Sequence, residues 1–127
     1  MYEVSVQATI SASHHLRGYR GKCEQVHGHN WLIEATVGSE TLDECGLSMD
    51  FGVLRQHLAE VLADFDHCDL NASRVFVDQN PSSENLARIV FERLRARLAQ
   101  GGAEVVRVRV WEKEGSCASY FERRDRP

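Results

Sequence analysis

The residues best suited to chemistry lie near the start of the chain. Cys23, His27 and His29 form the pattern Cys-x-x-x-His-Gly-His, and a further histidine, His14, precedes them. Imidazole is a common zinc ligand, and a site with three protein ligands keeps a fourth position for water or substrate. None of the four cysteines forms a Cys-x-x-Cys pair, so a closed zinc ribbon is not indicated. The spacing therefore predicts a catalytic zinc site beside a reactive cysteine.

Strand alternation indicates how these histidines would be held. Residues i and i+2 of a strand point to the same face, so both histidines of the His-Gly-His unit can reach one ion. Apolar residues alternate through 2–14 and end in His14, and through 29–38 they share the parity of His29. His15 has the opposite parity and is the weaker candidate. All three histidines are thus predicted at the ends of core-facing rows. The alternative is that they are unrelated residues with solvent or hydrogen-bond roles.

Length and composition predict one globular domain. The chain has 127 residues, of which 43% are hydrophobic and 27% charged, so it is long enough to bury one core but not two. We assign residues 1–127 to a single domain. The formal net charge of −4 argues against a nucleic-acid partner held by a general positive field. The first residues lack the features of a signal peptide, and no apolar run approaches the ~20 residues that cross a bilayer. A cytoplasmic protein with reduced thiols and no membrane partner is expected.

The remaining periodicity predicts two helices between two pairs of strands. Asp50 is suited to cap a helix with apolar residues every three or four positions up to about Asp64. A second helix should begin within 80–84, where proline suits the first turn and glutamate the positive end. Strands are expected at 105–111 and 116–122. The order ββααββ predicts an α+β fold in which two helices cover one face of an antiparallel sheet.

Glu112 is unusual because it continues a row of apolar side chains. Val106, Val108 and Val110 share its parity in the strand expected at 105–111. An ionised carboxylate at the end of such a row needs a partner or a wet cavity. We therefore expect Glu112 to face a pocket. The alternative is that the strand has already ended and the side chain is simply exposed.

Several short segments along the chain form a recognisable set. They are Ala12-Ser13-His14, Cys23-x-x-x-His27-Gly28-His29, Met49-Asp50-Phe51, Asp66-His67, Leu70-Asn71, Asn80-Pro81-Ser82-Ser83-Glu84-Asn85 and Val110-Trp111-Glu112. Together they resemble the 6-pyruvoyltetrahydropterin synthase family, and more closely its 6-carboxytetrahydropterin synthase branch in queuosine biosynthesis, over nearly the whole chain. The resemblance implies a tunnelling fold (T-fold) with a four-stranded antiparallel sheet and two helices per subunit. Barrel-like trimers would pair into a homohexamer with active sites between subunits.

The resemblance implies a reaction and the residues that perform it. The enzyme would be a lyase that converts 7,8-dihydroneopterin triphosphate to 6-carboxy-5,6,7,8-tetrahydropterin and releases acetaldehyde and triphosphate. A carboxylate can accept two hydrogen bonds from the donor edge of a pterin, as it does from a guanidinium. The implied site residues are His14, His27 and His29 for Zn²⁺; Cys23 as general base, with Asp66 and His67 as a catalytic relay; and Glu112, Ser83 and Glu84 for the substrate.

Three alternatives stay open. Glu24 creates a second pattern, Glu-x-x-His-Gly-His, which resembles folate-branch relatives that make 6-hydroxymethyldihydropterin. Glu24 is therefore either an alternative base, in a bifunctional or folate-branch enzyme, or a solvated loop residue. A 6-pyruvoyltetrahydropterin synthase would use the same metal and acid–base groups. The non-enzyme alternative is a catalytically inactive zinc-binding assembly module, and the joint presence of Cys23, Asp66, His67 and Glu112 argues against it.

Overall fold

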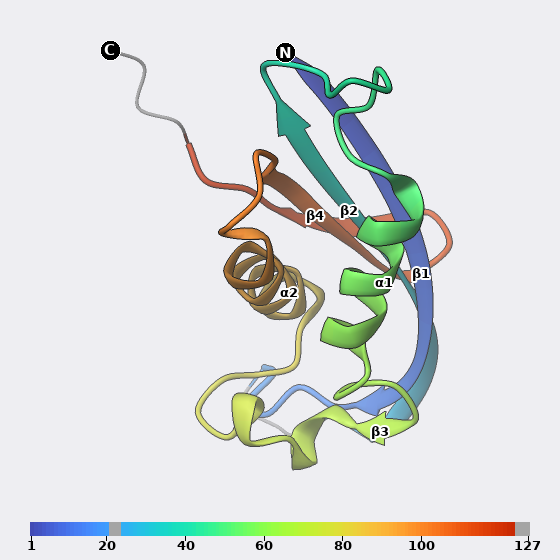
Figure 1. The fold of residues 1–127 in the computed structure, drawn as a ribbon. Helices are drawn as coiled ribbons and strands as arrows, with labels where there is room; N and C mark the ends of the chain where they lie inside the picture. The colour runs from blue at the N-terminus through green and yellow to red at the C-terminus, as the bar shows by residue number, and fades with distance from the viewer. Residues whose placement is uncertain (21–23, 124–127) are drawn as a thin grey trace.

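One mixed sheet and two α-helices make up the computed structural model, which describes residues 1–20 and 24–123 (Figure 1). The strand order is β3-β1-β2-β4-β5, and neighbouring strands are antiparallel except for β3, which runs parallel to β1. Two short 3₁₀ helices lie before α2. The elements are β1 (Tyr2–His14), β2 (His27–Ser39), α1 (Phe51–Leu62), β3 (Cys68–Asp69), η1 (Leu70–Ala72), η2 (Arg74–Phe76), α2 (Ser83–Leu98), β4 (Glu104–Lys113) and β5 (Ser116–Tyr120).

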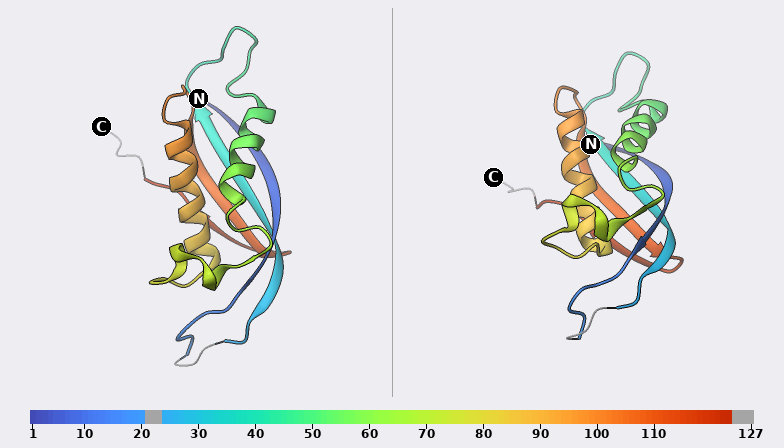
Figure 2. Two further views of the ribbon diagram at one scale, coloured as in Figure 1. Left: turned by 60° about the horizontal axis from the view of Figure 1, so that its bottom comes forward. Right: turned by 90° about the horizontal axis from the view of Figure 1, so that it is seen from below.

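The predicted α+β fold with two helices on one face of the sheet is confirmed (Figures 1 and 2). The four long strands form the expected antiparallel sheet, and β3 is the element that the sequence did not predict. Its two residues pair with Ala12 and Ser13 at the outer edge of β1. A two-residue strand has too little alternation to be recognised in a sequence. It covers the β1 edge only beside the end that carries His14.

The helices hold the core against the sheet. α1 packs on β1, and α2 packs on β4 and β5. Asp50 caps α1 by accepting a hydrogen bond from the Val53 N–H, as predicted, and Ser82 caps α2 by accepting from the Asn85 N–H. Burial of each large apolar side chain contributes about 1.5–3 kcal/mol to folding. Side chains with no exposed surface include Trp31, Ile33, Leu54, Leu58, Phe65, Leu70, Phe76, Leu86, Val90 and Leu94.

The other face of the sheet carries polar pairs. The Ser5 and Thr36 hydroxyl oxygens lie 2.7 Å apart, and the Gln7 amide donates to Glu34 (3.0 Å). Arg109 lies 3.9 Å from the Glu34 carboxylate across the next strand. Strand alternation therefore separates a polar face from the apolar, helix-covered face. The histidine rows belong to the apolar face, as predicted.

The row on β4 differs from the prediction at its start. The pairing of β4 with β2 shifts between Thr36 and Val37, which inserts one extra residue into β4. Val105 therefore takes the buried position (9% exposed), and Val106, which the sequence placed in the row, is only partly buried. Beyond this bulge Val108 and Val110 are fully buried, as predicted.

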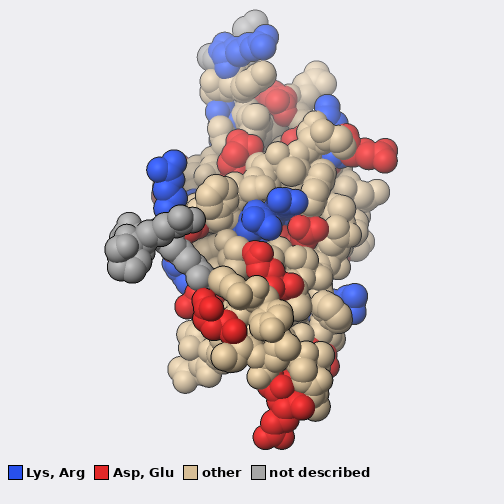
Figure 3. Space-filling model, turned by 90° about the horizontal axis from the view of Figure 1, so that it is seen from above, with Lys and Arg blue, Asp and Glu red and all other residues tan. Residues whose placement is uncertain are grey.

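Surface charge on the described residues is mixed in sign. The face seen in Figure 3 shows acidic and basic side chains side by side. No helix in the described part of the chain is both long enough and apolar enough to span a membrane.

Candidate metal centre and active site

Pairing of β1 with β2 brings the three predicted histidine ligands together. His14 lies directly opposite His27, and His29 pairs with the neighbouring Ala12. The His14 ring centroid lies 4.7 Å from that of His27 and 5.3 Å from that of His29. Trp31 forms the floor, since its ring packs edge-on against His14 at 4.8 Å and its Nε1–H donates to the Ala12 carbonyl (3.1 Å). The sheet register alone therefore makes the cluster.

Main-chain carbonyls orient two of the rings by contacting their Nδ1 atoms. His14 Nδ1 lies 2.7 Å from the Pro81 carbonyl oxygen, and His27 Nδ1 lies 2.9 Å from the Gln25 carbonyl oxygen. A carbonyl can only accept a hydrogen bond, so both Nδ1 atoms carry the proton. The Nε2 atom of a neutral ring then carries a lone pair, which is the form that binds a metal.

These lone pairs meet at short distance, which makes the cluster fit a cation. His14 Nε2 lies 3.1 Å from His27 Nε2, although both rings use their Nδ1 proton elsewhere. Glu112 Oε1 lies 3.3 Å from His14 Nε2 and 3.7 Å from His27 Nε2. Acceptors this close repel one another unless a proton or a metal ion lies among them. One ligand atom from each of His14, His27, His29 and Glu112 lies within 4.8 Å of the others, so the four could hold a metal ion.

The surroundings of His29 also favour a bound cation. Its buried Nε2 lies 2.7 Å from Glu112 Oε1, yet the two atoms are not aligned for a hydrogen bond, and Nε2 has no other hydrogen-bond partner among the described residues. Burial is the main cause that keeps the pKa of His29 below the ordinary histidine value. Glu112 opposes this shift, while the rings of His27 and His14 add to it. A neutral, unpartnered imidazole nitrogen is suited to bind zinc.

Glu112 faces the histidines, as the sequence predicted when it placed this residue toward a pocket. All three of its contacts to the rings are made by Oε1. Partial burial acts to raise its pKa, but the His14 and His29 rings outweigh this effect, and the pKa of Glu112 lies below its usual value. The carboxylate is therefore ionised at neutral pH. It is available either to the cation or to a donor group of a substrate.

Asp66 and His67 form the predicted pair, on the outer edge of β1. His67 Nδ1 lies 3.0 Å from Asp66 Oδ1, which also accepts the Ser11 N–H (2.9 Å). That main-chain hydrogen bond is the main cause that lowers the pKa of Asp66; desolvation opposes it, and His67 adds to the lowering. His67 has a left-handed backbone conformation (φ 57°), uncommon for a residue with a side chain, and its N–H donates to the Ser11 carbonyl (2.6 Å). The pair is therefore held firmly although the His67 side chain is exposed.

This pair and the histidine cluster share a hollow but, among the described residues, are not directly bonded. The hollow, of about 530 Å³, is lined by His67 and in part by Ser11, Ser13 and Asn30, and His29 of the cluster also lines it. No hydrogen bond or ion pair between described residues links the two groups.

The other predicted site residues are placed as follows. Cys23 lies outside the described residues. Glu24 is close to the cluster, because its Oε1 lies 3.4 Å from His27 Nδ1. Ser83 and Glu84 form the first turn of α2, directly after the Pro81 carbonyl that contacts His14. Within the described part of the chain, their side chains form no hydrogen bond or ion pair with the four cluster residues.

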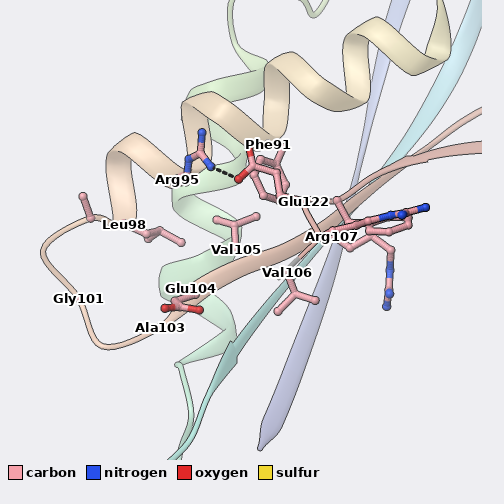
Figure 4. A pocket seen from close by; sticks show the side chains of 13 residues that line it. Phe91, Arg95, Leu98, Gly101, Ala103, Glu104, Val105, Val106, Arg107 and Glu122 are labelled. Atoms are coloured by element: carbon pink, nitrogen blue, oxygen red, sulfur yellow. Dashed lines mark hydrogen bonds and ion pairs between the residues drawn. The ribbon is translucent and has the colours of Figure 1, made fainter. Parts of the chain in front are cut away.

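A separate hollow of about 600 Å³ lies between the C-terminal end of α2 and the first residues of β4 (Figure 4). Its walls combine apolar side chains such as Phe91 and Val105 with an ion pair between Arg95 and Glu122 (2.6 Å). It lies at the opposite end of β4 from Glu112, and none of the predicted site residues lines it. The candidate chemistry of the chain therefore lies elsewhere.

Sequence reasoning missed the groups that orient the rings. The carbonyls of Pro81 and Gln25 belong to residues with no titratable side chain, and nothing in residue type marks them. Asn80, next to Pro81, was interpreted only as part of a helix start, yet its side chain holds the segment that contains Arg17. An asparagine before a proline was the one available signal, because that pair favours a turn rather than a helix.

The fold and the cluster together define the class, that of T-fold pterin synthases. Caenorhabditis elegans 6-pyruvoyl tetrahydropterin synthase superimposes with a TM-score of 0.81 over 96% of each chain at 21% sequence identity. The Plasmodium vivax enzyme of the same name gives 0.79 over 95% of this chain and 97% of that one, at 17% identity.

The chain belongs to the 6-pyruvoyl tetrahydropterin synthase family, whose sequence model matches residues 3–123. A Synechocystis protein named 6-carboxy-5,6,7,8-tetrahydropterin synthase is 33% identical over 133 residues, covering 100% of this chain and 98% of its own. A protein of the same name from Aquifex aeolicus is 33% identical over 80% of this chain and 76% of its own. An Archaeoglobus fulgidus protein that carries this name provisionally is 36% identical over 91% of each chain. Relatives of this kind make the chain an enzyme of a lyase family.

Proposed function

We propose that this protein is a zinc-dependent 6-carboxytetrahydropterin synthase of queuosine biosynthesis. It would convert 7,8-dihydroneopterin triphosphate to 6-carboxy-5,6,7,8-tetrahydropterin, acetaldehyde and triphosphate. The observation that carries the proposal is the convergence of three imidazole Nε2 atoms. In His14 and His27 the Nδ1 proton is donated to a main-chain carbonyl, so the Nε2 atom carries a lone pair. The names of the 33–36% identical relatives support the 6-carboxy branch.

Each predicted residue has a role in this proposal. His14, His27 and His29 hold zinc, which when bound acidifies the side-chain hydroxyls of the substrate. Cys23 removes a proton from that side chain as general base, and its thiol needs nearby positive charge because its ordinary pKa is about 8.5. Glu112 accepts the donor edge of the pterin. Ser83 and Glu84 assist at the same edge.

Asp66 and His67 complete the relay, and we propose that they do so for a neighbouring copy. Both sheet edges support assembly: among residues 1–20 and 24–123, β3 pairs only with Ala12 and Ser13 of β1, and β5 pairs with β4 from Val108 onward. Unpaired strand edges are sites for another strand, and a homohexamer of two barrel-like trimers would cover them. The active site then lies between subunits of a cytoplasmic enzyme built from one domain, 1–127.

A second candidate function rests on Glu24. Its carboxylate lies 3.4 Å from His27 Nδ1, so it reaches the metal cluster from the position that follows Cys23 in the sequence. A Pyrococcus furiosus protein named dihydroneopterin monophosphate aldolase is 34% identical over 70% of this chain and 72% of its own. We propose that Glu24 serves as a second base for a folate-branch product, 6-hydroxymethyldihydropterin.

One assay tests both functions. Zinc-loaded protein is incubated with 7,8-dihydroneopterin triphosphate, and the pterin and aldehyde products are identified by mass spectrometry. The 6-carboxy product with acetaldehyde is expected from the wild type and should disappear in Cys23→Ala. A 6-hydroxymethyl product that disappears in Glu24→Ala would establish the second base. If Cys23→Ala abolished both products and Glu24→Ala affected neither, the two-base proposal would be wrong. A 6-pyruvoyl product, or no turnover with zinc bound, would overturn the main proposal.

A further inference from the structure

We infer that Asn80 is a positioning residue for the metal centre, because its side-chain amide anchors the main chain directly before Pro81, whose carbonyl orients the His14 ring. The inference rests on the proposed zinc-binding role of His14. Pro81 is 67 residues from His14 in the chain and is buried against it. Some structure must therefore fix this long-range contact, and neither residue belongs to an element shared with the other.

The Asn80 amide supplies that structure by pairing with the main chain of Arg17. The Arg17 N–H donates to Asn80 Oδ1 (2.8 Å), and Asn80 Nδ2 donates to the Arg17 carbonyl (3.0 Å). One side chain thus satisfies both main-chain groups of a residue just beyond the end of β1. We call this pair of hydrogen bonds the Asn80 clamp. It ties the residue before Pro81 to the segment that immediately follows His14.

Further hydrogen bonds keep the clamp from moving as a unit. The Arg17 guanidinium donates to the carbonyls of Phe76, Val77 and Gln79. Asn85, in the first turn of α2, donates through Nδ2 to the Asn80 carbonyl (2.8 Å). Asn80 is therefore fixed through both its side chain and its main chain. The fixed φ of proline then limits where the Pro81 carbonyl can point.

A second amide repeats the arrangement two residues earlier. The His15 N–H donates to Asn71 Oδ1 (2.9 Å), and Asn71 Nδ2 donates to the His15 carbonyl (3.0 Å). The two asparagines thus satisfy the main-chain N–H and carbonyl groups of residues 15 and 17, beyond the end of β1. Only Asn80 is directly linked to the carbonyl that contacts His14, which makes it the residue to test.

The two carbonyl-held rings differ in a way that gives an internal control. His27 is held by Gln25, two residues away in an exposed loop, so its orientation is set locally. The Nδ1 atom of His14 is held through the tertiary contact with Pro81. Loss of the clamp should therefore disturb the His14 tautomer and leave that of His27 unchanged. Groups that orient metal-bound histidines typically change metal affinity about 10- to 100-fold when they are removed.

The test compares wild-type protein with Asn80→Ala, and uses Asp50→Ala as the matched control. Asp50 caps α1 and has no contact with the clamp, so its loss tests for general destabilisation. Histidine ¹⁵N-labelled, metal-free protein is examined by NMR about two pH units above the ordinary histidine pKa of about 6.5, where the ring tautomers are read directly. Zinc Kd is measured separately by competition with a chelator of known affinity.

In the wild type, His14 and His27 should both be protonated at Nδ1. Asn80→Ala should give a mixed tautomer at His14 alone and a zinc Kd weaker by about 10- to 100-fold, whereas Asp50→Ala should change neither. Asn80→Asp keeps the acceptor for the Arg17 N–H and loses the donor to the Arg17 carbonyl. Its His14 tautomer ratio and zinc Kd should therefore lie between those of the wild type and Asn80→Ala. It replaces Asn80→Ala in the test if Asn80→Ala does not fold.

Two results would overturn the inference: an Nε2-protonated His14 in the wild type, or a folded Asn80 variant with the wild-type tautomer and Kd. The tautomer is measured without metal or substrate, so this test is independent of catalysis. A wild type that made no pterin product would refute the proposed function, and the NMR measurement would still decide the role of Asn80.

Discussion

Replacing Glu112 by glutamine separates its two available roles, pterin anchor and metal ligand. We expect the anchor role, so the variant should lose charge-assisted hydrogen bonds to the substrate and keep its zinc. A hydrogen bond to a charged group contributes about 1.5–3 kcal/mol and a neutral one about 0.5–1.5 kcal/mol. The Glu112 side chain is 33% exposed, so we take the low end, about 1 kcal/mol for each of two bonds. The sum of about 2 kcal/mol corresponds to an increase in KM of about 30-fold.

The assay is steady-state kinetics on fully zinc-loaded protein together with a zinc competition titration. Zinc Kd should change by less than about threefold, because in the anchor role Glu112 does not bind the metal. Loss of a direct ligand should instead weaken zinc binding by more than the about 10- to 100-fold effect of losing a supporting group. Glu114→Gln is the control, since it makes the same change of charge at an exposed residue two positions beyond the cluster. A zinc Kd weakened tenfold or more with KM unchanged would show that Glu112 is a metal ligand and refute the anchor role.

Two further predictions concern His29 in the cluster and Asp66 at the β1 edge. His29→Ala should weaken zinc binding by more than about 100-fold and abolish turnover with the far-UV circular dichroism spectrum unchanged, because it removes a direct ligand; retained activity in verified metal-free protein would contradict this. The pKa of Asp66 is lowered in the fold by the Ser11 N–H, so its stabilisation is complete above the ordinary aspartate pKa of about 3.9 and is lost as pH falls through the lower folded value. In urea unfolding, wild type should therefore be more stable than Asp66→Asn at pH 7, with the difference shrinking below about pH 4, and a pH-independent difference would contradict the assignment.

Much of the histidine cluster was predictable because strand parity is a local property. The sequence placed His14 and His29 at the ends of apolar rows, and the β1–β2 register confirmed that these rows meet on one face. Glu112 was predicted in the same way, from a row of three valines of which the structure keeps Val108 and Val110. Both helices also begin where the sequence predicted, at Asp50 and within 80–84. At each place an acidic or hydroxyl side chain caps the helix just before its regularly spaced apolar residues.

What the sequence could not provide were long-range contacts made by main-chain groups. The proton position on His14 depends on a carbonyl 67 residues away, and every residue has such a carbonyl. The bulge that moved Val105 into the core in place of Val106 depends on how β4 pairs with β2, which alternation within β4 does not reveal. The β3 pairing next to Ala12 depends in turn on the left-handed backbone of His67, a conformation that residue type does not announce.

The placement of Asp66 and His67 also limits how the proposed reaction can be organised. The histidine cluster and the pair both depend on β1, but Ser11 holds Asp66 and His67 through its main-chain N–H and carbonyl, which lie in the plane of the sheet. The pair therefore lies at the β1 edge, and no hydrogen bond or ion pair between described residues links it to the cluster. We propose that the pair acts on the substrate of a second copy of the chain, docked at the β1 edge that β3 leaves largely unpaired among the described residues. Dilution to the free subunit should then remove turnover while the cluster keeps its zinc.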